Sequence, residues 1–166
     1  GMADHFFNNC YENTGFELLG GKPVFTGKIL GGCIDSIYDI FDNSRFEDTV
    51  SLCKKYDLFP SLMEWKNKIL LLETSENKPE PKLYRKMIGA LKEYGIFDVL
   101  SGVLVGKPQD EVYYDEYKQI LLEETAGKDL SIVYNINIGH ATPRCIIPFG
   151  VEAEVNVDKQ VITFDS

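Results

Sequence analysis

The segment I-L-L-L-E-T-S-E at residues 69–76 holds four aliphatic residues in a row, followed at once by the carboxylate of Glu73. An unbroken aliphatic run bounded by polar residues is typical of a strand that is buried on both faces, in the centre of a parallel sheet covered by helices. Open α/β sheets bind their ligands at the carboxyl ends of such strands. Glu73 is therefore the first candidate for a functional side chain.

Strand and helix patterns alternate around this segment. We predict strands over residues 23–30, 68–73, 101–106 and 130–136. We predict helices over residues 33–41, from Pro81 to Gly95 and from Pro108 to Gly127, and the inner face of the second comprises Leu83, Met87, Ile88, Leu91 and Tyr94. A short helix near residues 46–53 and irregular chain over residues 57–65 precede the central strand. Such alternation indicates right-handed crossovers and a mainly parallel sheet.

The C-terminal part of the chain has a different pattern. Apolar residues alternate strictly with polar ones over residues 151–157, residues 158–159 suit a turn, and residues 160–164 can return as a second strand. This pattern predicts an antiparallel hairpin with one face in water. The predicted fold is therefore a layered α/β domain with a mainly parallel sheet and an additional antiparallel hairpin at the C-terminus.

Composition limits the possible partners. The chain has 166 residues, 44% hydrophobic and 26% charged, with a formal net charge of -9. This is a globular composition, and its acidic balance argues against nucleic acid or an anionic membrane as a partner, because both require basic surfaces. No apolar run approaches the roughly 20 residues that span a bilayer, and no signal peptide is recognisable.

The N-terminus and the cysteines indicate the setting of the chain. Gly1 before Met2 is typical of tag removal, and we interpret residues 1–14 as a tag remnant and an interdomain remnant. The four cysteines are scattered without a C-x-x-C pair, which favours free thiols in a cytoplasmic protein.

Two polar side chains are expected at the same edge of the predicted sheet. Glu73 ends the strand over residues 68–73, and His140 follows the strand over residues 130–136. A carboxylate beside an imidazole fixes its tautomer and stabilises its charged form, so that the imidazole can act as a general base. The structural alternative, a solvated glutamate cap and a packed histidine, remains open at this point.

A nucleophile is harder to find. The sequence contains no G-x-S-x-G elbow, and Cys33 has the closest context, after Gly31-Gly32 at a predicted strand-to-helix turn. A Cys33–His140–Glu73 triad is thus a second hypothesis, although a buried structural cysteine is favoured over a nucleophile. The two histidines are far apart in sequence and no zinc-type spacing is present, so no metal or cofactor is expected.

Four segments resemble the LD-carboxypeptidase family, which includes muramoyl-tetrapeptide carboxypeptidases and microcin C immunity proteins. They are G-K-I-L-G-G-C at residues 27–33, I-L-L-L-E-T-S-E at 69–76, S-G-V-L-V-G-K-P-Q-D at 101–110 and the stretch from Tyr134 to Val155. They occur in the family's order, and the resemblance runs from about Gly15 to the end of the chain.

The resemblance implies a Ser–Glu–His hydrolase of which this chain is the C-terminal domain, residues 15–166. The family's glutamate corresponds to Glu73 and its histidine to His140, whereas the serine lies in an N-terminal nucleophile domain that is missing here. The implied fold is a layered β/β/α unit of the swivelling type. Residues 42–65 are longer than the family pattern.

The implied substrates and partners follow from the same resemblance. They are a small peptide, such as a murein tetrapeptide in peptidoglycan recycling, or a peptidyl or aminoacyl nucleotide in microcin immunity. The T-S-E continuation after Glu73 is closer to the immunity branch. The other partners are the missing nucleophile domain and a second copy in a possible homodimer. A non-catalytic peptide-binding module is the third hypothesis.

Overall fold

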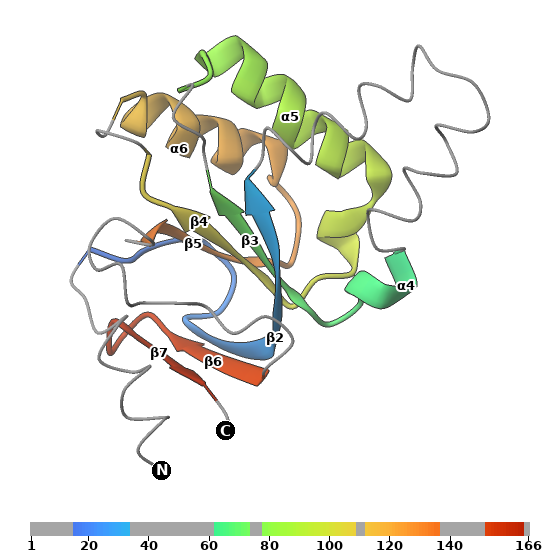
Figure 1. Ribbon diagram of the computed structural model, residues 1–166, viewed down its shortest axis with the longest axis vertical. Coiled ribbons are helices and arrows are strands. Elements are labelled where there is room, and N and C mark those ends of the chain that lie inside the picture. Colours follow the sequence, from blue (N-terminus) through green and yellow to red (C-terminus); the bar gives the residue numbers. More distant parts are fainter. Residues whose placement is uncertain (1–14, 34–61, 74–77, 109–111, 137–151, 165–166) are drawn as a thin grey trace.

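The structure is a computed structural model that describes residues 15–33, 62–73, 78–108, 112–136 and 152–164 (Figure 1). Within these ranges, seven strands form one sheet in the order β1-β5-β4-β3-β2-β6-β7. Their bounds are β1 Glu17–Gly20, β2 Val24–Cys33, β3 Ile69–Glu73, β4 Gly102–Gly106, β5 Ser131–Ile136, β6 Glu152–Asn156 and β7 Val161–Phe164. The described helices are α4 Leu62–Trp65, α5 Pro81–Tyr94, the short 3-10 helix η1 Ile96–Asp98 and α6 Tyr114–Glu124.

The centre of the sheet is parallel, as the sequence predicts. Strands β2, β3, β4 and β5 pair in parallel in chain order, and β1 and the β6–β7 hairpin add antiparallel strands at the two sides. All four aliphatic residues of β3 are at most 2% exposed. This burial explains why the segment carries no polar residue until Glu73, since both faces of a central strand are covered.

Helices α5 and α6 cover one face of the sheet (Figure 1). Their buried side chains pack in one cluster with the even-numbered residues of β3, Leu70 and Leu72, together with Val103 and Val105 of β4. We call this the helix side. The inner face of α5 was predicted with one error, because Leu83 is 39% exposed and its neighbour Tyr84 is buried instead.

The buried positions of α5 follow the helical repeat from Tyr84 rather than from Leu83. Tyr84 stacks on Tyr117 of α6 with ring centroids 4.0 Å apart, and Met87, Ile88 and Leu91 continue the same face. Pro81 begins the helix and Gly95, with φ of 94°, ends it in the left-handed conformation that favours glycine. Both boundaries agree with the prediction.

Helix α6 starts later than predicted. It runs from Tyr114, and Tyr113 precedes it with φ of 62°. The helix ends at Glu124, before Gly127, and the hydroxyl of the following Thr125 donates to the Leu121 carbonyl at 2.6 Å. Residues 109–111, where we predicted the first turn, lie outside the described residues.

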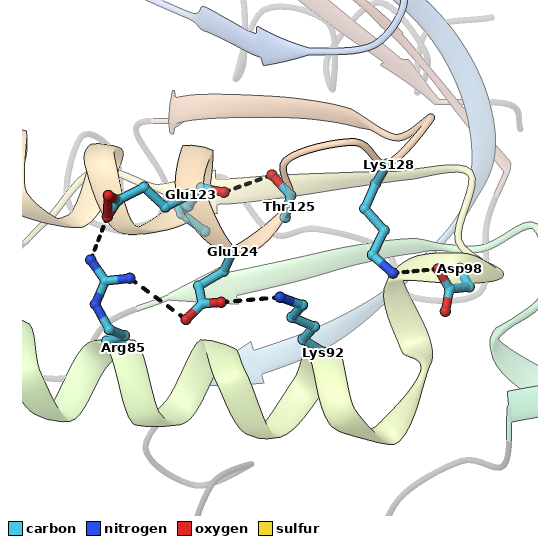
Figure 2. Close-up of polar contacts among 8 residues, drawn as sticks. Arg85, Lys92, Asp98, Glu123, Glu124, Thr125 and Lys128 are labelled. Atoms are coloured by element: carbon cyan, nitrogen blue, oxygen red, sulfur yellow. Dashed lines mark hydrogen bonds and ion pairs between the residues drawn. The ribbon is translucent and has the colours of Figure 1, made fainter.

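Ion pairs join the solvent sides of α5 and α6. Figure 2 shows Arg85 between Glu123 and Glu124, with Lys92 also reaching Glu124 at 3.5 Å. Lys128 pairs with Asp98 of η1 at 2.6 Å. Because the side chains of Arg85 and Glu123 are nearly half exposed, water screens their interaction.

The β6–β7 hairpin covers the opposite face, which we call the hairpin side. A second core cluster joins Ile69 and Leu71 of β3 to Val155 of β6 and Phe164 of β7. The predicted alternation is confirmed, since Ala153 and Val155 are buried whereas Glu152 and Glu154 are exposed. With helices on one face and the hairpin on the other, the domain has β, β and α layers (Figure 1).

Strand β2 belongs to both parts of the sheet. Residues 24–28 pair with β6, and residues 29–33 pair with β3. The prediction that Gly31-Gly32 ends this strand is wrong, because both glycines pair with β3 inside it. At Gly31, φ is 147° and an added Cβ would lie 2.1 Å from the Leu71 carbonyl oxygen, so only glycine allows the two backbones to approach.

The segments before β2 and between β2 and β3 differ from the predictions or lie outside the described residues. Residues 62–65 of the segment predicted to be irregular form α4, with Trp65 buried. Strand β1 was not predicted, although it pairs with β5. The helix predicted over residues 33–41 does not begin at Cys33, which is the last residue of β2, and its other residues lie outside the described part of the chain, as does the helix predicted over residues 46–53. Among the residues that the structure describes, no helix is long and apolar enough to cross a membrane.

Candidate functional site

The carboxyl ends of the four parallel strands form one continuous rim. Cys33 pairs with Glu73 across β2 and β3, and Leu72 pairs with Val105, which places Glu73 beside Gly106 of β4. Gly106 in turn pairs with Ile136, the last residue of β5. The rim is therefore defined by residues 33, 73, 106 and 136, as the parallel arrangement of the strands predicts.

Glu73 occupies the hairpin side of this rim. Strand residues alternate between faces, and Ile69 and Leu71 lie in the hairpin-side core, so Glu73 continues that face. It is half-buried. An added Cβ on Gly106 would lie 3.5 Å from the Glu73 Cγ, so the side chain of Glu73 lies against a residue that has no side chain of its own.

The absence of a side chain at position 106 leaves the carboxylate room on the side of β5. Neighbouring strands are about 4.8 Å apart, so β5 lies two spacings, about 10 Å, from β3. A side chain a few residues beyond the end of β5 can span that distance. The geometry thus allows an acid from β3 to meet a group carried by the segment after β5.

His140 follows Ile136 by four residues and lies outside the described residues. The structure describes the strand that leads to it, which ends at the same rim as β3. The pairing of His140 with Glu73 remains a prediction.

The structure changes the context of Cys33. It is the last residue of β2 and the pairing partner of Glu73. Because Gly31-Gly32 lies within the strand, the predicted turn at these glycines before Cys33 is wrong. The residues that follow Cys33 lie outside the described residues. The nearness of Cys33 to Glu73 in the sheet is nevertheless real.

A polar network joins β5, α6 and β1, and it was not predicted from the sequence. The Tyr134 hydroxyl donates to the Tyr114 carbonyl at 2.7 Å, and the Tyr114 hydroxyl donates to the Glu17 carboxylate. Lys118 also pairs with Glu17, with its Nζ 2.7 Å from Oε1. No sequence signal marked Glu17, because its partners are about a hundred residues away.

The pKa shifts in this network indicate a structural role. Burial raises the pKa of Glu17, but the hydrogen bonds from Lys118 and Tyr114 outweigh it and the net pKa is lowered. Burial, with smaller effects of neighbouring tyrosines and Glu17, raises the pKa of Tyr134. The Glu17 carboxylate is thus held in its charged form and the Tyr134 phenol in its neutral form, which is unlike a proton-transfer site.

Pro79, two residues before α5, is held by a tyrosine of α6. The Tyr117 hydroxyl donates to the Pro79 carbonyl, and Tyr113 packs against Tyr117 with ring centroids 5.7 Å apart. This contact fixes the entry to α5 close to the rim. In the part of the chain described, no group of three or more histidine, cysteine, aspartate or glutamate residues could hold a metal ion.

Comparison with known proteins assigns the fold. The family described as the LD-carboxypeptidase C-terminal domain matches residues 26–155, most of the chain. The chain belongs to the LD-carboxypeptidase family. The resemblance inferred from the sequence motifs is thereby confirmed.

Individual relatives are longer than this chain. A protein of Treponema pallidum (strain Nichols) named "Putative carboxypeptidase" is 28% identical over 98% of this chain and 43% of its own length. A crystal structure of an MccF-like protein from Streptococcus pneumoniae in complex with AMP is 59% identical, with a TM-score of 0.82, over 92% of this chain and 44% of that chain.

A more distant structure shares the fold. Microcin C7 self-immunity protein MccF, in complex with glutamyl sulfamoyl guanosine, is 18% identical with a TM-score of 0.65 and matches 93% of this chain and 42% of its own. This chain therefore spans less than half the length of the relatives it matches and corresponds to their C-terminal domain.

Proposed function

We propose that residues 15–166 form the C-terminal domain of a serine LD-carboxypeptidase-like hydrolase in which Glu73 and His140 belong to the catalytic triad. The serine attacks the carbonyl carbon of an amide, and His140 takes the serine proton and passes it to the leaving amine. Glu73 orients the imidazole and stabilises its charged form. The sequence has no G-x-S-x-G elbow, so the proposal assigns the serine to a nucleophile domain outside this chain.

The position of Glu73 carries the proposal. Its carboxylate stands at the end of a strand that is otherwise entirely apolar, on the rim where the segment leading to His140 leaves the sheet. Its side chain lies over Gly106, which leaves space toward β5.

The proposed substrate is a peptidyl or aminoacyl nucleotide, with a murein tetrapeptide as the alternative. The relative that is 59% identical is described in complex with AMP, and MccF is described in complex with glutamyl sulfamoyl guanosine. A murein tetrapeptide contains an amide at the C-terminal side of a short acyl chain, and the proposed nucleotide substrates are those whose peptidyl or aminoacyl group is joined to the nucleotide through nitrogen, which is also an amide bond. The expected reaction is hydrolysis of that amide without a metal or cofactor.

Titration of the histidine tests the Glu73–His140 pair without any activity. The chain has two histidines, so the imidazole signals of His140 can be assigned by comparison with His140→Ala. A nearby carboxylate raises an imidazole pKa, so Glu73→Gln should lower the pKa of His140. Glu154→Gln, an exposed carboxylate of β6, is the matched control and should have no effect. An unchanged His140 titration in Glu73→Gln contradicts the proposed pair.

An activity assay tests the reaction. The chain alone should not hydrolyse either substrate, whereas a fusion to the N-terminal part of the Streptococcus pneumoniae relative should cleave the peptidyl nucleotide. In that fusion Glu73→Gln and His140→Ala should each lower kcat by about a thousandfold or more, and the double variant little further, because triad members act as a unit. Activity that survives His140→Ala refutes the proposed role.

The Cys33 hydrolase remains a second candidate because Cys33 pairs directly with Glu73. A nucleophilic thiolate should react with iodoacetamide at neutral pH faster than the other cysteines, and Cys33→Ser should abolish any hydrolysis by the chain alone. Slow alkylation of Cys33 together with an inactive chain removes this candidate.

A further inference from the structure

Strand β5 contains a bulge just before the rim. Leu104 of β4 pairs with Val133, but Gly106 pairs with Ile136, so two steps along β4 correspond to three steps along β5. The extra residue lies between Val133 and Ile136. Bulges are rare in parallel pairs and are over-represented beside active sites, where they redirect a strand.

Asn135 has the backbone conformation that this bulge requires. Its φ is 69°, in the left-handed region, which asparagine adopts more readily than any other residue except glycine. The conformation allows one residue to be left out of the pairing with β4. Without it, Asn135 instead of Ile136 would stand beside Gly106.

The side chain of Asn135 is tied to the start of the domain. Its Nδ2 donates to the Gly15 carbonyl at 2.9 Å. Gly15 has a φ of 111°, and a Cβ added to it would lie only 3.0 Å from that nitrogen. The adjoining Phe16 is held by Gln160, which accepts from its N–H at 2.7 Å and donates to its carbonyl at 3.1 Å. Two side-chain amides thus fix residues 15–16 beside the bulge.

The side-chain oxygen of Asn135 does not contribute a hydrogen bond to the folded state among the described residues. This Oδ1 atom is buried and receives no hydrogen bond from the residues that the structure describes. A buried acceptor without a donor is a cost to the folded state, so this residue is not what packing alone would select. The positive φ and the tie to Gly15 are what an asparagine contributes here.

We propose that Asn135 is a positioning residue for the rim: its left-handed backbone puts Ile136, the last residue of β5, beside Gly106 and on the face that carries Glu73. The reason is the period of two in a strand, because a shift of one residue would move Ile136 to the opposite face. Ile136 is fully buried in the hairpin-side core, the face on which Glu73 lies. This inference rests on the proposed Glu73–His140 pair.

The test uses three variants of the whole chain that separate backbone from side chain. Asn135→Gly keeps access to the left-handed region and removes the amide. Asn135→Val disfavours that region strongly, and Asn135→Ala does so less strongly and serves if the valine variant does not fold. Two quantities are measured in each: the imidazole titration of His140, and amide hydrogen exchange of Lys107, whose N–H donates to the Ile136 carbonyl at 2.7 Å.

The expected results are specific. Asn135→Gly should keep the His140 titration and the Lys107 protection of the parent chain. Asn135→Val, or Asn135→Ala, should speed Lys107 exchange by about tenfold or more relative to Val103 and should move the His140 pKa toward its value in Glu73→Gln.

Three results overturn the proposal. One is a folded valine or alanine variant with the parent titration and Lys107 protection. Another is a glycine variant that behaves like the valine variant. A third is a lowered thermal midpoint with an unmoved His140 titration, which means a purely structural role. If Glu73→Gln itself leaves His140 unchanged, the proposed function fails, and Lys107 exchange alone still decides whether Asn135 sets the pairing.

Discussion

The two faces of the central sheet are closed by different means. The helix side is built mainly from residues 62–136, with Leu19 of β1 and Leu30 of β2 packed against it, and its outer contacts are exposed ion pairs between α5 and α6. The hairpin side combines β3 and β4 with β6 and β7 from the end of the domain and with Phe16 from its beginning. At its edge, the side-chain amide of Gln160 makes two hydrogen bonds with the backbone of Phe16. The first side thus comes mostly from one part of the chain, whereas apolar side chains from the start and the end of the domain meet on the second.

The largest expected effect is at Gly31, where the two sides share β2. Gly31→Val should prevent folding, because the added Cβ would fall 2.1 Å from the Leu71 carbonyl oxygen at a φ of 147°. Gly89→Ala in α5 is the matched control, since nothing lies within 4 Å of its Cβ position. It should stabilise the chain by about 0.5–1 kcal/mol. Circular dichroism and urea unfolding measure both, and a folded Gly31→Val would contradict the close approach.

Adjacent residues of β3 allow a direct comparison of the two cores. Leu70 faces the helix side and Leu71 the hairpin side, and each is at most 2% exposed. Either change to alanine should cost about 2–5 kcal/mol. Amide exchange should then rise first in α5 for Leu70→Ala and first in β6 for Leu71→Ala. The same exchange pattern in both variants would show that the two cores do not respond separately.

The Gln160 contact should have an intermediate effect. Gln160→Ala removes both hydrogen bonds to Phe16 and should cost about 1–2 kcal/mol in urea unfolding. Gln160→Gly loses the same bonds but relieves the left-handed backbone at φ of 56°, so it should be the less destabilised of the two. Equal stability of parent and alanine variant would show that the amide does not hold Phe16.

The Glu17 network predicts a pH dependence with a definite sign. Because the pKa of Glu17 is lowered in the folded state, its contribution is complete above the unfolded value of 4.5 and is lost as pH falls through the folded value. Glu17→Gln should therefore cost about 1 kcal/mol at pH 7 and progressively less below pH 4.5. Tyr114→Phe, which removes one donor to Glu17, should show part of this dependence. Thermal midpoints from pH 3 to 7 measure it, and a constant difference would contradict it.

The smallest effect is expected for the ion pairs of the helix side. Arg85 and Glu123 are nearly half exposed, so Arg85→Ala should leave the urea midpoint within experimental error. Adding 1 M NaCl should likewise change the parent chain little. A clear loss of stability in Arg85→Ala would mean that the ion pairs shown in Figure 2 contribute more to the helix side than their exposure indicates.

Features that depend on neighbours in sequence were predictable. The aliphatic run of β3, the glycine stop of α5 and the alternation of β6 each express a local period or turn. Strand β1 was not predictable, because four residues without alternation are defined only by their pairing with β5. The glycines at 31 and 32 were interpreted as a turn because their true reason, the approach of β3, is a long-range contact.

The candidate site divides in the same way. The position of Glu73 at a strand end follows from the apolar run before it. Its relation to Gly106 could not be predicted, because the feature that matters there is the lack of a side chain on another strand. The bulge at Asn135 was missed for a similar reason, since an extra residue is visible only when both strands are aligned.

The division of the cores has a consequence for synthesis on the ribosome. Residues 62–136 can form the helix side as soon as they emerge, but the hairpin side lacks its cover until β6 and β7 have been made. At about 5–20 residues per second the apolar face of Ile69, Leu71 and Leu104 stays open for one to several seconds. During that interval the exposed apolar face can bind chaperones. A translation pause near residue 150 would lengthen the interval.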